Sequence, residues 1–267
     1  MIRMKVIIFQ GGLGNQIFQY AFYKKITELE KEVYYIYRKG KYSHNGLELN
    51  KYFDVSLQIA PWYIRMLFLL CDILKQKGIL NLFTNENSKL FPKGLFLDGY
   101  WQDKRYFYQG FIRLKKLCLN NKNRDILFQI KEVQSVSIHI RRGDYLLPHF
   151  KLIYGGVCSE SYYNKAINIC LDKFKDCRFF VFSDDILWVK EHLVLPNAVY
   201  IDWNKGDDSI YDLYLMTQTR CNIIANSTFS FWGAYLNESN LLTIYPSKWY
   251  NSTFEVPDIF PQNWIGI

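Results

Sequence analysis

An apolar strand that ends in charge is the first place in this chain where chemistry is expected. The stretch VSIHIRRGDY runs from apolar residues into His139, Arg141, Arg142 and Asp144. Along a strand, residues 139 and 141 point to one side and residue 142 to the other. A guanidinium is costly to bury unpaired, and its planar fork matches phosphate or carboxylate oxygens. We therefore expect an anionic ligand at His139 and Arg141, with an internal ion-pair network as the alternative.

Carboxylates end a second expected strand. The sequence RFFVFSDD closes on Ser183, Asp184 and Asp185. These groups could hold a metal, read the edge of a base or, because Asp is a good N-cap, begin the next helix. Arg142 is expected to pair with Asp144 or with a carboxylate of a facing domain. Since the chain has no D-x-D triplet, we expect arginine and helix N-termini, not a metal, to neutralise a diphosphate.

A glycine-rich turn follows the first expected strand. In GGLGNQ, Gly12 and Gly14 let backbone N–H groups approach a ligand where a helix begins, and Asn15 and Gln16 add polar groups that favour ligand contact. The dinucleotide fingerprint would need a glycine where Ile17 stands, so a nicotinamide cofactor is disfavoured. A purely structural tight turn is the alternative.

Hydroxyl groups begin a later expected helix. The motif NSTFSFWG places five candidate ligand-binding residues after an apolar strand: Asn226, Ser227, Thr228, Phe229 and Ser230. Hydroxyls and N–H groups at the positive end of a helix form a natural phosphate cradle. Simple N-capping is the alternative.

The alternation of strands and helices indicates how these residues are positioned. Strands are expected at 4–10, 33–37, within 93–107, and at 135–140, 178–183, 198–202, 222–226 and 241–246. Helices are expected at 15–30, 61–84, 103–117, 159–174, 185–193, 209–220 and 228–237. This pattern favours parallel sheets covered on both faces, which bind ligands at the carboxyl ends of their strands. All the candidate groups above fall at such ends, and the polar run at 120–125 is the best domain boundary.

Composition limits the classes of function. The chain has 267 residues, 49% of them hydrophobic, and a net charge of +8, which favours an anionic partner. No nucleic-acid-binding motif is present, so no nucleic acid is expected. Six cysteines without a C-x-x-C pair and the lack of a signal peptide indicate a cytoplasmic protein. The apolar segment 59–80 contains Arg65 and Asp72 and favours an amphipathic core helix, with contact to a membrane surface as the minority alternative.

At this point the chain resembles a known family. The blocks GGLGNQIFQYAF, GYWQDKRYF, VSIHIRRGDY, FSDDILWVK and LMTQTRCNIIANSTFSFWGAYLN stand in the order seen in bacterial α-1,2-fucosyltransferases of glycosyltransferase family 11, over residues 5–250. The resemblance implies an α/β, GT-B-like fold of two Rossmann-like domains with mainly parallel sheets facing a cleft. Residues 1–125 would form the acceptor-side domain and residues 126–267 the domain that binds GDP-fucose.

The resemblance also implies an activity. Such enzymes are inverting transferases that move L-fucose from GDP-β-L-fucose to the 2-hydroxyl of a glycan, without an obligatory metal or other cofactor. The expected acceptor is a terminal β-galactoside, in the synthesis of O-antigen or surface polysaccharide, with loose contact to the inner membrane face as an option. Another deoxysugar or hexose transferase, a non-catalytic nucleotide-sugar-binding protein and a nucleic-acid-binding protein are the alternatives.

Residue roles carry over from the family by motif. Arg141 would bind the β-phosphate, His139 would lie near the nucleotide, and the cluster Ser227, Thr228 and Phe229 would hold the diphosphate. Asp212, before that cluster, would read guanine, and Asn15 would face the fucose or the acceptor. Asp144 is the first candidate for a general base and His149 the second, although some relatives manage without a carboxylate base. The sequence departs from the family at YGGVC, where a His-Gly pair is usual, and at Phe231, where Trp is usual.

Overall fold

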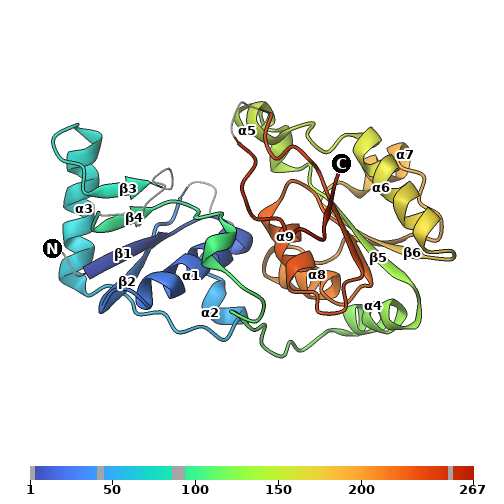
Figure 1. Cartoon of the computed structure of the whole chain (residues 1–267), viewed down its shortest axis with the longest axis horizontal. Helices are drawn as coiled ribbons and strands as arrows, with labels where there is room; N and C mark the ends of the chain where they lie inside the picture. Colours follow the sequence, from blue (N-terminus) through green and yellow to red (C-terminus); the bar gives the residue numbers. More distant parts are fainter. Residues whose placement is uncertain (1–3, 41–44, 86–93, 252–254) are drawn as a thin grey trace. The chain divides into compact units, whose positions relative to one another are not determined.

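The computed structural model describes residues 4–40, 45–85, 94–251 and 255–267. The chain divides into two compact units, Met1–Lys115 and Lys116–Ile267 (Figure 1). Each unit has its own sheet, and every pair of neighbouring strands in these two sheets is parallel. Two units of Rossmann-like α/β structure with parallel sheets confirm the expected fold class. That the units face a cleft stays a prediction.

The first unit is a four-stranded sheet in the order β2-β1-β4-β3. Its strands are β1 (Met4–Phe9), β2 (Glu32–Tyr37), β3 (Phe83–Asn85) and β4 (Phe96–Asp98). Its helices are α1 (Leu13–Thr27), α2 (Leu49–Tyr52), α3 (Trp62–Gln76) and the short 3-10 turn η1 (Lys104–Tyr106). Val6 and Ile8 of β1 pack with α3, whereas Phe9 contacts Tyr23 of α1 with ring centroids 6.3 Å apart. The alternation of side chains along β1 thus gives α1 and α3 opposite faces of the sheet.

Two helices expected in this unit are shorter in the structure. The helix expected over 61–84 ends at Gln76, because Gly78 turns the chain with φ +69°, and β3 follows. The helix expected over 103–117 is only the turn η1. Gly110, with φ +81°, turns the chain there, and Phe107 packs on Phe18 of α1 from a loop instead. Apolar spacing alone did not separate these loops from helices.

The second unit is a six-stranded sheet in the order β10-β9-β8-β5-β6-β7. Its strands are β5 (Ser135–Ile140), β6 (Arg178–Ser183), β7 (Val199–Ile201), β8 (Cys221–Ile223), β9 (Leu242–Tyr245) and β10 (Ile265–Gly266). Its helices are α4 (Asn121–Glu132), α5 (Pro148–Tyr154), α6 (Glu160–Lys173), α7 (Ile186–His192), α8 (Ser209–Met216) and α9 (Thr228–Tyr235), with the 3-10 turns η2 (Asp144–Leu146) and η3 (Gly206–Asp208). The strands and helices expected between 135 and 246 are all confirmed, with several ending earlier than expected.

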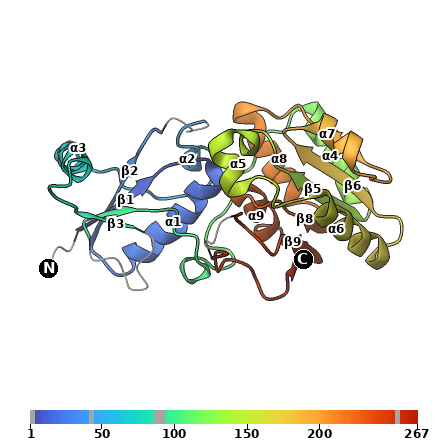
Figure 2. The same cartoon turned by 90° about the horizontal axis from the view of Figure 1, so that it is seen from above.

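Helices cover both faces of this second sheet (Figure 2). Ile138 and its neighbours on β5 pack with α6 and α7, while Phe180 and Phe182 of β6 pack with α4 and α8. Helix α4 was not expected: its first turn is the polar run 120–125, in which the Asn120 side chain accepts a hydrogen bond from Asn123 N at 2.9 Å. The predicted domain boundary after residue 125 therefore falls within α4. A polar run can begin a capped helix as well as form a linker.

Both sheets reverse their direction of winding beside their first strand. In the first unit the chain goes from β1 to β2 on one side and then to β3 and β4 on the other. In the second unit it goes from β5 through β6 to β7, and then crosses to β8 and β9. Ligands of parallel α/β sheets bind at the carboxyl ends of the strands at such a reversal. The loops after β5 and β8, and after β1 and β4, are therefore the expected positions of a ligand site.

Candidate functional site

The reversal in the second unit brings together residues from motifs far apart in the sequence. Arg141 follows β5, Asp184 follows β6, and Asn226 lies between β8 and α9. The guanidinium of Arg141 contacts Asp184 at 3.1 Å, and Tyr145 of the β5 loop donates a hydrogen bond to Asn226 O at 2.9 Å. The groups that were expected at separate strand ends thus form one polar edge.

Arg141 is the charged centre of this edge. Its Nη2 lies 2.9 Å from Asp144 Oδ1 and its Nη1 lies 3.1 Å from Asp184 Oδ2. Burial alone would lower the pKa of Arg141, but the carboxylates of Asp184 and Asp144 outweigh burial and raise the pKa above its ordinary value. The side chain keeps 27% of its surface exposed. The structure therefore shows the alternative, an internal ion-pair network, and part of the Arg141 side chain remains exposed.

Arg142 has a partner that the sequence did not suggest. Its backbone N–H donates to Asp184 Oδ1 at 2.8 Å, and its Nε donates to Asp185 Oδ2 at 3.0 Å. The guanidinium also lies 4.0 Å from the ring centroid of Trp188, a cation–π contact. The expectation that Arg142 pairs with Asp144 is wrong, because Arg141 already holds that carboxylate. Arg142 instead joins the β5 loop to α7.

Asp185 and Ser183 have local structural roles. Asp185 is the N-cap of α7, and its Oδ1 accepts a hydrogen bond from Trp188 N at 3.2 Å. The Ser183 hydroxyl accepts a hydrogen bond from Asp185 N at 3.0 Å. The helix-capping alternative for this carboxylate pair is therefore realised at Asp185, while Asp184 serves the two arginines.

His139 is a buried neutral imidazole beside the charged centre. Burial, reinforced by the nearby charge of Arg141, lowers its pKa to about 3. Its ring centroid lies 5.9 Å from that of Phe229 on α9. Within the described parts of the chain, its Nδ1 has no hydrogen-bond partner. Because buried polar atoms are nearly always paired, this nitrogen is a candidate contact for a bound ligand.

The beginning of α9 presents part of the expected phosphate cradle. Ser227 is the N-cap residue, but its side chain makes no capping hydrogen bond. Thr228 and Phe229 in the first turn are partly exposed. Ser230 differs, since it is buried and its hydroxyl donates to Ala225 O and Ser227 O at 3.4 and 3.3 Å. The groups suited to an anion are therefore the Ser227 hydroxyl and the first turn of α9. Ser230 stabilises this turn through its hydrogen bonds to the main chain.

Asn226 holds the loops of the site together. Its Nδ2 donates to Tyr154 O and Trp249 O at 3.2 and 3.1 Å, and its Oδ1 accepts from Cys158 Sγ at 3.4 Å. Burial raises the pKa of the Cys158 thiol to about 12, so this cysteine is a structural partner and not a nucleophile. Tyr145 and Cys158 were not among the residues predicted from the sequence. Tyr145 stood in the first motif, but nothing in the sequence signalled Cys158.

Asp212 belongs to a second polar group in the same unit. Its Oδ1 accepts a hydrogen bond from Asn204 Nδ2 at 2.7 Å, and Asn204 and Asn123 exchange two amide hydrogen bonds of 2.9 Å. Burial raises the pKa of Asp212 to about 8, although the bond from Asn204 opposes this shift. A carboxyl group with such a pKa is largely protonated at neutral pH, which is unusual for aspartate and typical of functional sites.

The glycine turn in the first unit is closely packed. Gly12 is the N-cap residue of α1 and Gly14 is buried in its first turn. Gly11 has φ +78°, and a Cβ there would lie 2.9 Å from the Asn15 side-chain nitrogen. Asn15 itself is partly exposed, and its Oδ1 accepts a hydrogen bond from Gln102 at 3.3 Å. The turn thus has both a structural requirement for glycine and one accessible amide.

Gln16 has a structural role that the sequence did not distinguish from ligand contact. The side chain is fully buried. Its Nε2 donates to Gly11 O and Gly46 O at 3.0 and 2.7 Å, and its Oε1 accepts from Glu48 N at 2.9 Å. All three partners are main-chain groups, so Gln16 anchors the segment before α2 to the glycine turn.

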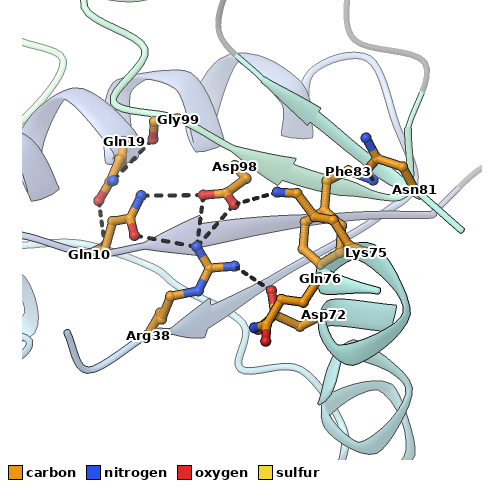
Figure 3. A network of polar contacts seen from close by, with 10 residues as sticks. All are labelled: Gln10, Gln19, Arg38, Asp72, Lys75, Gln76, Asn81, Phe83, Asp98 and Gly99. Atoms are coloured by element: carbon orange, nitrogen blue, oxygen red, sulfur yellow. Dashed lines mark hydrogen bonds and ion pairs between the residues drawn. The ribbon is translucent and has the colours of Figure 1, made fainter. Parts of the chain in front are cut away.

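A charged network lies at the strand ends of the first unit, as Figure 3 shows. Arg38 follows β2, and its Nη1 contacts both oxygens of Asp98, the last residue of β4, at 3.0 and 2.9 Å. Gln10, after β1, donates to Asp98 at 3.2 Å. From α3, Asp72 lies 3.6 Å from Arg38 and Lys75 lies 3.7 Å from Asp98. These pairs hold three strand ends and α3 together. Sequence analysis missed them, although each of the first three residues stands at the end of a strand.

The carboxylates at the charged edge of the second unit are all paired with arginine. Asp144 and Asp184 contact Arg141, and Asp185 contacts Arg142. Among the described residues, no group of three or more His, Cys, Asp or Glu side chains has the arrangement of a metal site. An anion can be held here by arginine and helix N–H groups.

Gly143 tests how tightly the arginine loop is fitted. A Cβ at this position would lie 2.8 Å from Asp184 Oδ2, so we expect Gly143→Ala to displace that carboxylate from both arginines. The free energy of unfolding in urea should fall by about 1–3 kcal/mol. In an Asp184→Ala background the same substitution should cost far less, since the clashing group is gone. Equal costs in both backgrounds would contradict a direct clash.

Known proteins are similar to this chain over nearly its full length. The sequence model of Glycosyl transferase family 11 matches residues 68–267. An α-1,2-colitosyltransferase of Escherichia coli is 31% identical over 96% of this chain and 96% of its own length. The O-antigen biosynthesis glycosyltransferase WbnK of Escherichia coli is 29% identical over 90% and 93%. A galactoside 2-α-L-fucosyltransferase, Sec1 of Mus musculus, is 26% identical over 49% of this chain and 38% of its own.

The family match covers the whole charged edge of the second unit, and in the first unit it covers the second half of α3 together with β3 and β4. The colitosyltransferase extends the similarity to nearly the full length of the chain. An enzyme of this kind joins a sugar from a nucleotide-sugar donor to a glycan, and the accessible arginine and the uncapped beginning of α9 suit the anionic half of such a donor. This chain belongs to glycosyltransferase family 11.

Proposed function

We propose that the enzyme transfers L-fucose from GDP-β-L-fucose to the 2-hydroxyl of a galactose-containing glycan, with inversion at the anomeric carbon. One observation carries the donor half of this proposal. At the winding reversal of the second sheet, Arg141 follows the strand that carries His139, whose Nδ1 is unpaired among the described residues and whose ring centroid lies 5.9 Å from that of Phe229 in the first turn of the uncapped helix α9. The names of three relatives support the proposed sugar, linkage and acceptor. They are a galactoside 2-α-L-fucosyltransferase, an α-1,2-colitosyltransferase and an O-antigen biosynthesis glycosyltransferase.

The same groups would stabilise the departing nucleotide. When the bond from the sugar to the β-phosphate breaks, negative charge grows on the phosphate oxygens. The guanidinium of Arg141 would leave Asp144 and donate hydrogen bonds to two of these oxygens. Together with Ser227 and the first turn of α9, it would stabilise the negative charge where it develops. No step in this scheme requires a metal ion, and we propose that transfer is metal-independent.

The acceptor must lose a proton as its 2-hydroxyl attacks. Asp144 is the first candidate to accept this proton, because its partner Arg141 would move to the phosphate once the donor binds. His149, exposed on α5, is the second candidate. In the first unit, the accessible amide of Asn15 would hold a hydroxyl of the fucose or of the acceptor. The proposed acceptor is a terminal β-galactoside in O-antigen or surface polysaccharide synthesis.

Colitose is a second candidate for the transferred sugar. The relative with 31% identity over nearly the full length is a colitosyltransferase, and colitose is fucose without its 3-hydroxyl. A site that forms a hydrogen bond with the 3-hydroxyl of fucose discriminates strongly against colitose, because the polar group of the site is then left unpaired. An apolar site distinguishes the two sugars only weakly. Measuring kcat/KM for GDP-fucose and for GDP-colitose decides between these donors. If kcat/KM is higher for GDP-colitose, colitose and not fucose is the sugar transferred.

The cytoplasm is the proposed location. All six cysteines are free, and four of them are buried among core residues. Free thiols in the core fit a reducing compartment.

The first test is calorimetric titration of GDP, GDP-fucose, UDP and ADP into the full chain in EDTA. We expect selective binding of GDP and GDP-fucose, because the proposed phosphate site uses arginine and helix N–H groups. Transfer assays with galactosides, again in EDTA, then test the acceptor. Loss of binding in EDTA, or a preference for another nucleotide, would contradict the metal-free GDP-fucose proposal.

Replacing Arg141 tests the role of the guanidinium. We expect Arg141→Ala to reduce transfer by about 100- to 1,000-fold, because one preorganised charge opposite the leaving group is lost. Arg141→Lys should restore only part of the rate, since an ammonium cannot bind two oxygens at once. Arg124→Ala, on the exposed face of α4, is the matched control and should leave the rate unchanged. Near-normal turnover by a folded Arg141→Ala protein would exclude the phosphate role.

The raised pKa of Asp212 predicts a pH dependence of nucleotide binding. Its pKa of about 8 lies above the ordinary value of 3.8. Between about pH 4 and pH 8, the folded protein without ligand therefore keeps Asp212 protonated, whereas the unfolded chain has this carboxyl group ionised. A carboxylate that accepts N–H groups of guanine must lose this proton. GDP affinity should therefore rise from pH 6 to pH 8, and the contribution of Asp212 to the free energy of unfolding should fall over the interval from about pH 4 to pH 8.

Titrations in buffers of different ionisation enthalpy measure this proton directly. At pH 7, GDP binding by the wild-type protein should release close to one proton. Asp212→Asn should weaken binding and abolish both the proton release and the pH dependence. Proton release that persists in this variant would assign the titration to another group.

A further inference from the structure

Helix α3 of the first unit has two apolar faces, and only one of them is buried. Ile64, Phe68 and Cys71 pack against the sheet. The other face carries large apolar side chains that are each at least half exposed: Trp62, Tyr63, Met66, Leu69, Leu70 and Ile73. We call these six residues the α3 stripe. Both views place α3 at the periphery of the first unit (Figure 1, Figure 2).

The spacing of the α3 stripe makes it continuous. Residues 62, 66, 69 and 73 follow one another at intervals of four, three and four, which places them along one side of a helix. Tyr63 and Leu70 widen this side. Ile59 before the helix and Ile79 after it are also exposed, at 57% and 68%. Single exposed apolar residues are ordinary, but a continuous band of this length marks an interaction surface.

The charges around the stripe are positive. Between residues 55 and 85 the sequence contains Arg65, Lys75 and Lys77 but only one acid, Asp72. Asp72 is held by Arg38 at 3.6 Å and by Gln76 at 3.1 Å. Arg65 and Lys77 are exposed. The helix therefore presents an apolar band with cations beside it, on a chain whose net charge is +8.

We propose that α3 docks the enzyme onto the surface of a lipid bilayer that contains anionic headgroups. The stripe would lie at the boundary between headgroups and acyl chains, with Arg65 and Lys77 at the lipid phosphates. Trp62 and Tyr63 begin the helix, and these two residue types are the ones that favour the membrane interface. The described part of the chain contains no helix with the length and apolarity of a membrane span.

Vesicle flotation with the full chain tests this proposal. The probes are vesicles of phosphatidylcholine alone and of phosphatidylcholine with about one third phosphatidylglycerol. We expect binding to the anionic vesicles to exceed binding to the neutral ones by about tenfold, and to weaken in high salt. Leu69→Gln with Ile73→Gln should lower binding to both vesicles by about tenfold or more, because two buried apolar groups are lost. Arg65→Gln with Lys77→Gln should remove the preference for anionic vesicles.

The matched control replaces isolated exposed apolar residues of the second unit. Phe128 and Val194 are exposed by 67% and 87%, and Phe128→Gln with Val194→Gln should bind vesicles like the wild-type protein. Unchanged thermal unfolding midpoints show that all variants are folded. The proposal is overturned if the stripe variant and the control bind vesicles equally. It is also overturned if sedimentation shows a dimer of the wild-type protein that Leu69→Gln with Ile73→Gln dissociates, while neither protein binds vesicles.

Discussion

The contact of Arg141 with Asp144 and Asp184 is the interaction on which the described site depends. A guanidinium with most of its surface removed from water needs anionic partners, and the sheet supplies one of them through its register. Ile140 of β5 pairs with Ser183 of β6, so Arg141 and Asp184 leave adjacent strands at the same level. Gly143 lacks the side chain that would strike Asp184. The other carboxylate, Asp144, comes from the turn that follows.

The balance of charges at this edge of the second sheet bears on two properties, its stability without a ligand and its capacity to bind an anion. Arg141 and Arg142 stand against Asp144, Asp184 and Asp185, so the described side chains of the cluster carry more carboxylates than cations. The ligand-free site is therefore held together by its own ion pairs. A diphosphate that binds here must compete with a carboxylate for Arg141, and the positive end of α9 assists that exchange. Under the proposed function, donor binding and rearrangement of the ion pairs would therefore be coupled.

Sequence analysis predicted the second unit better than the first because strict alternation of buried strands and amphipathic helices leaves little choice of sheet. It also located Arg141, His139 and Ser227 at strand ends that the structure brings to one edge. It could not choose the partner of Arg142, because that choice depends on which carboxylate a neighbouring strand delivers. It likewise read the aromatic loop near Phe107 as a helix, since loops and helices that contact one face share the same apolar spacing. The network of Arg38 and Asp98 joins residues sixty positions apart and has no local signature.

The pairing of β5 with β6 has a consequence for how this enzyme can change over generations. Because side chains alternate along a strand, a slip of one residue between β5 and β6 would move every side chain of the shifted strand to the opposite face of the sheet. The loss or gain of a single residue inside either strand would therefore separate Arg141 from Asp184 in one step. Loops beyond the strand ends are under no such restriction. New specificities can arise by insertion into loops, whereas the strands that set the charged edge can accept only substitutions.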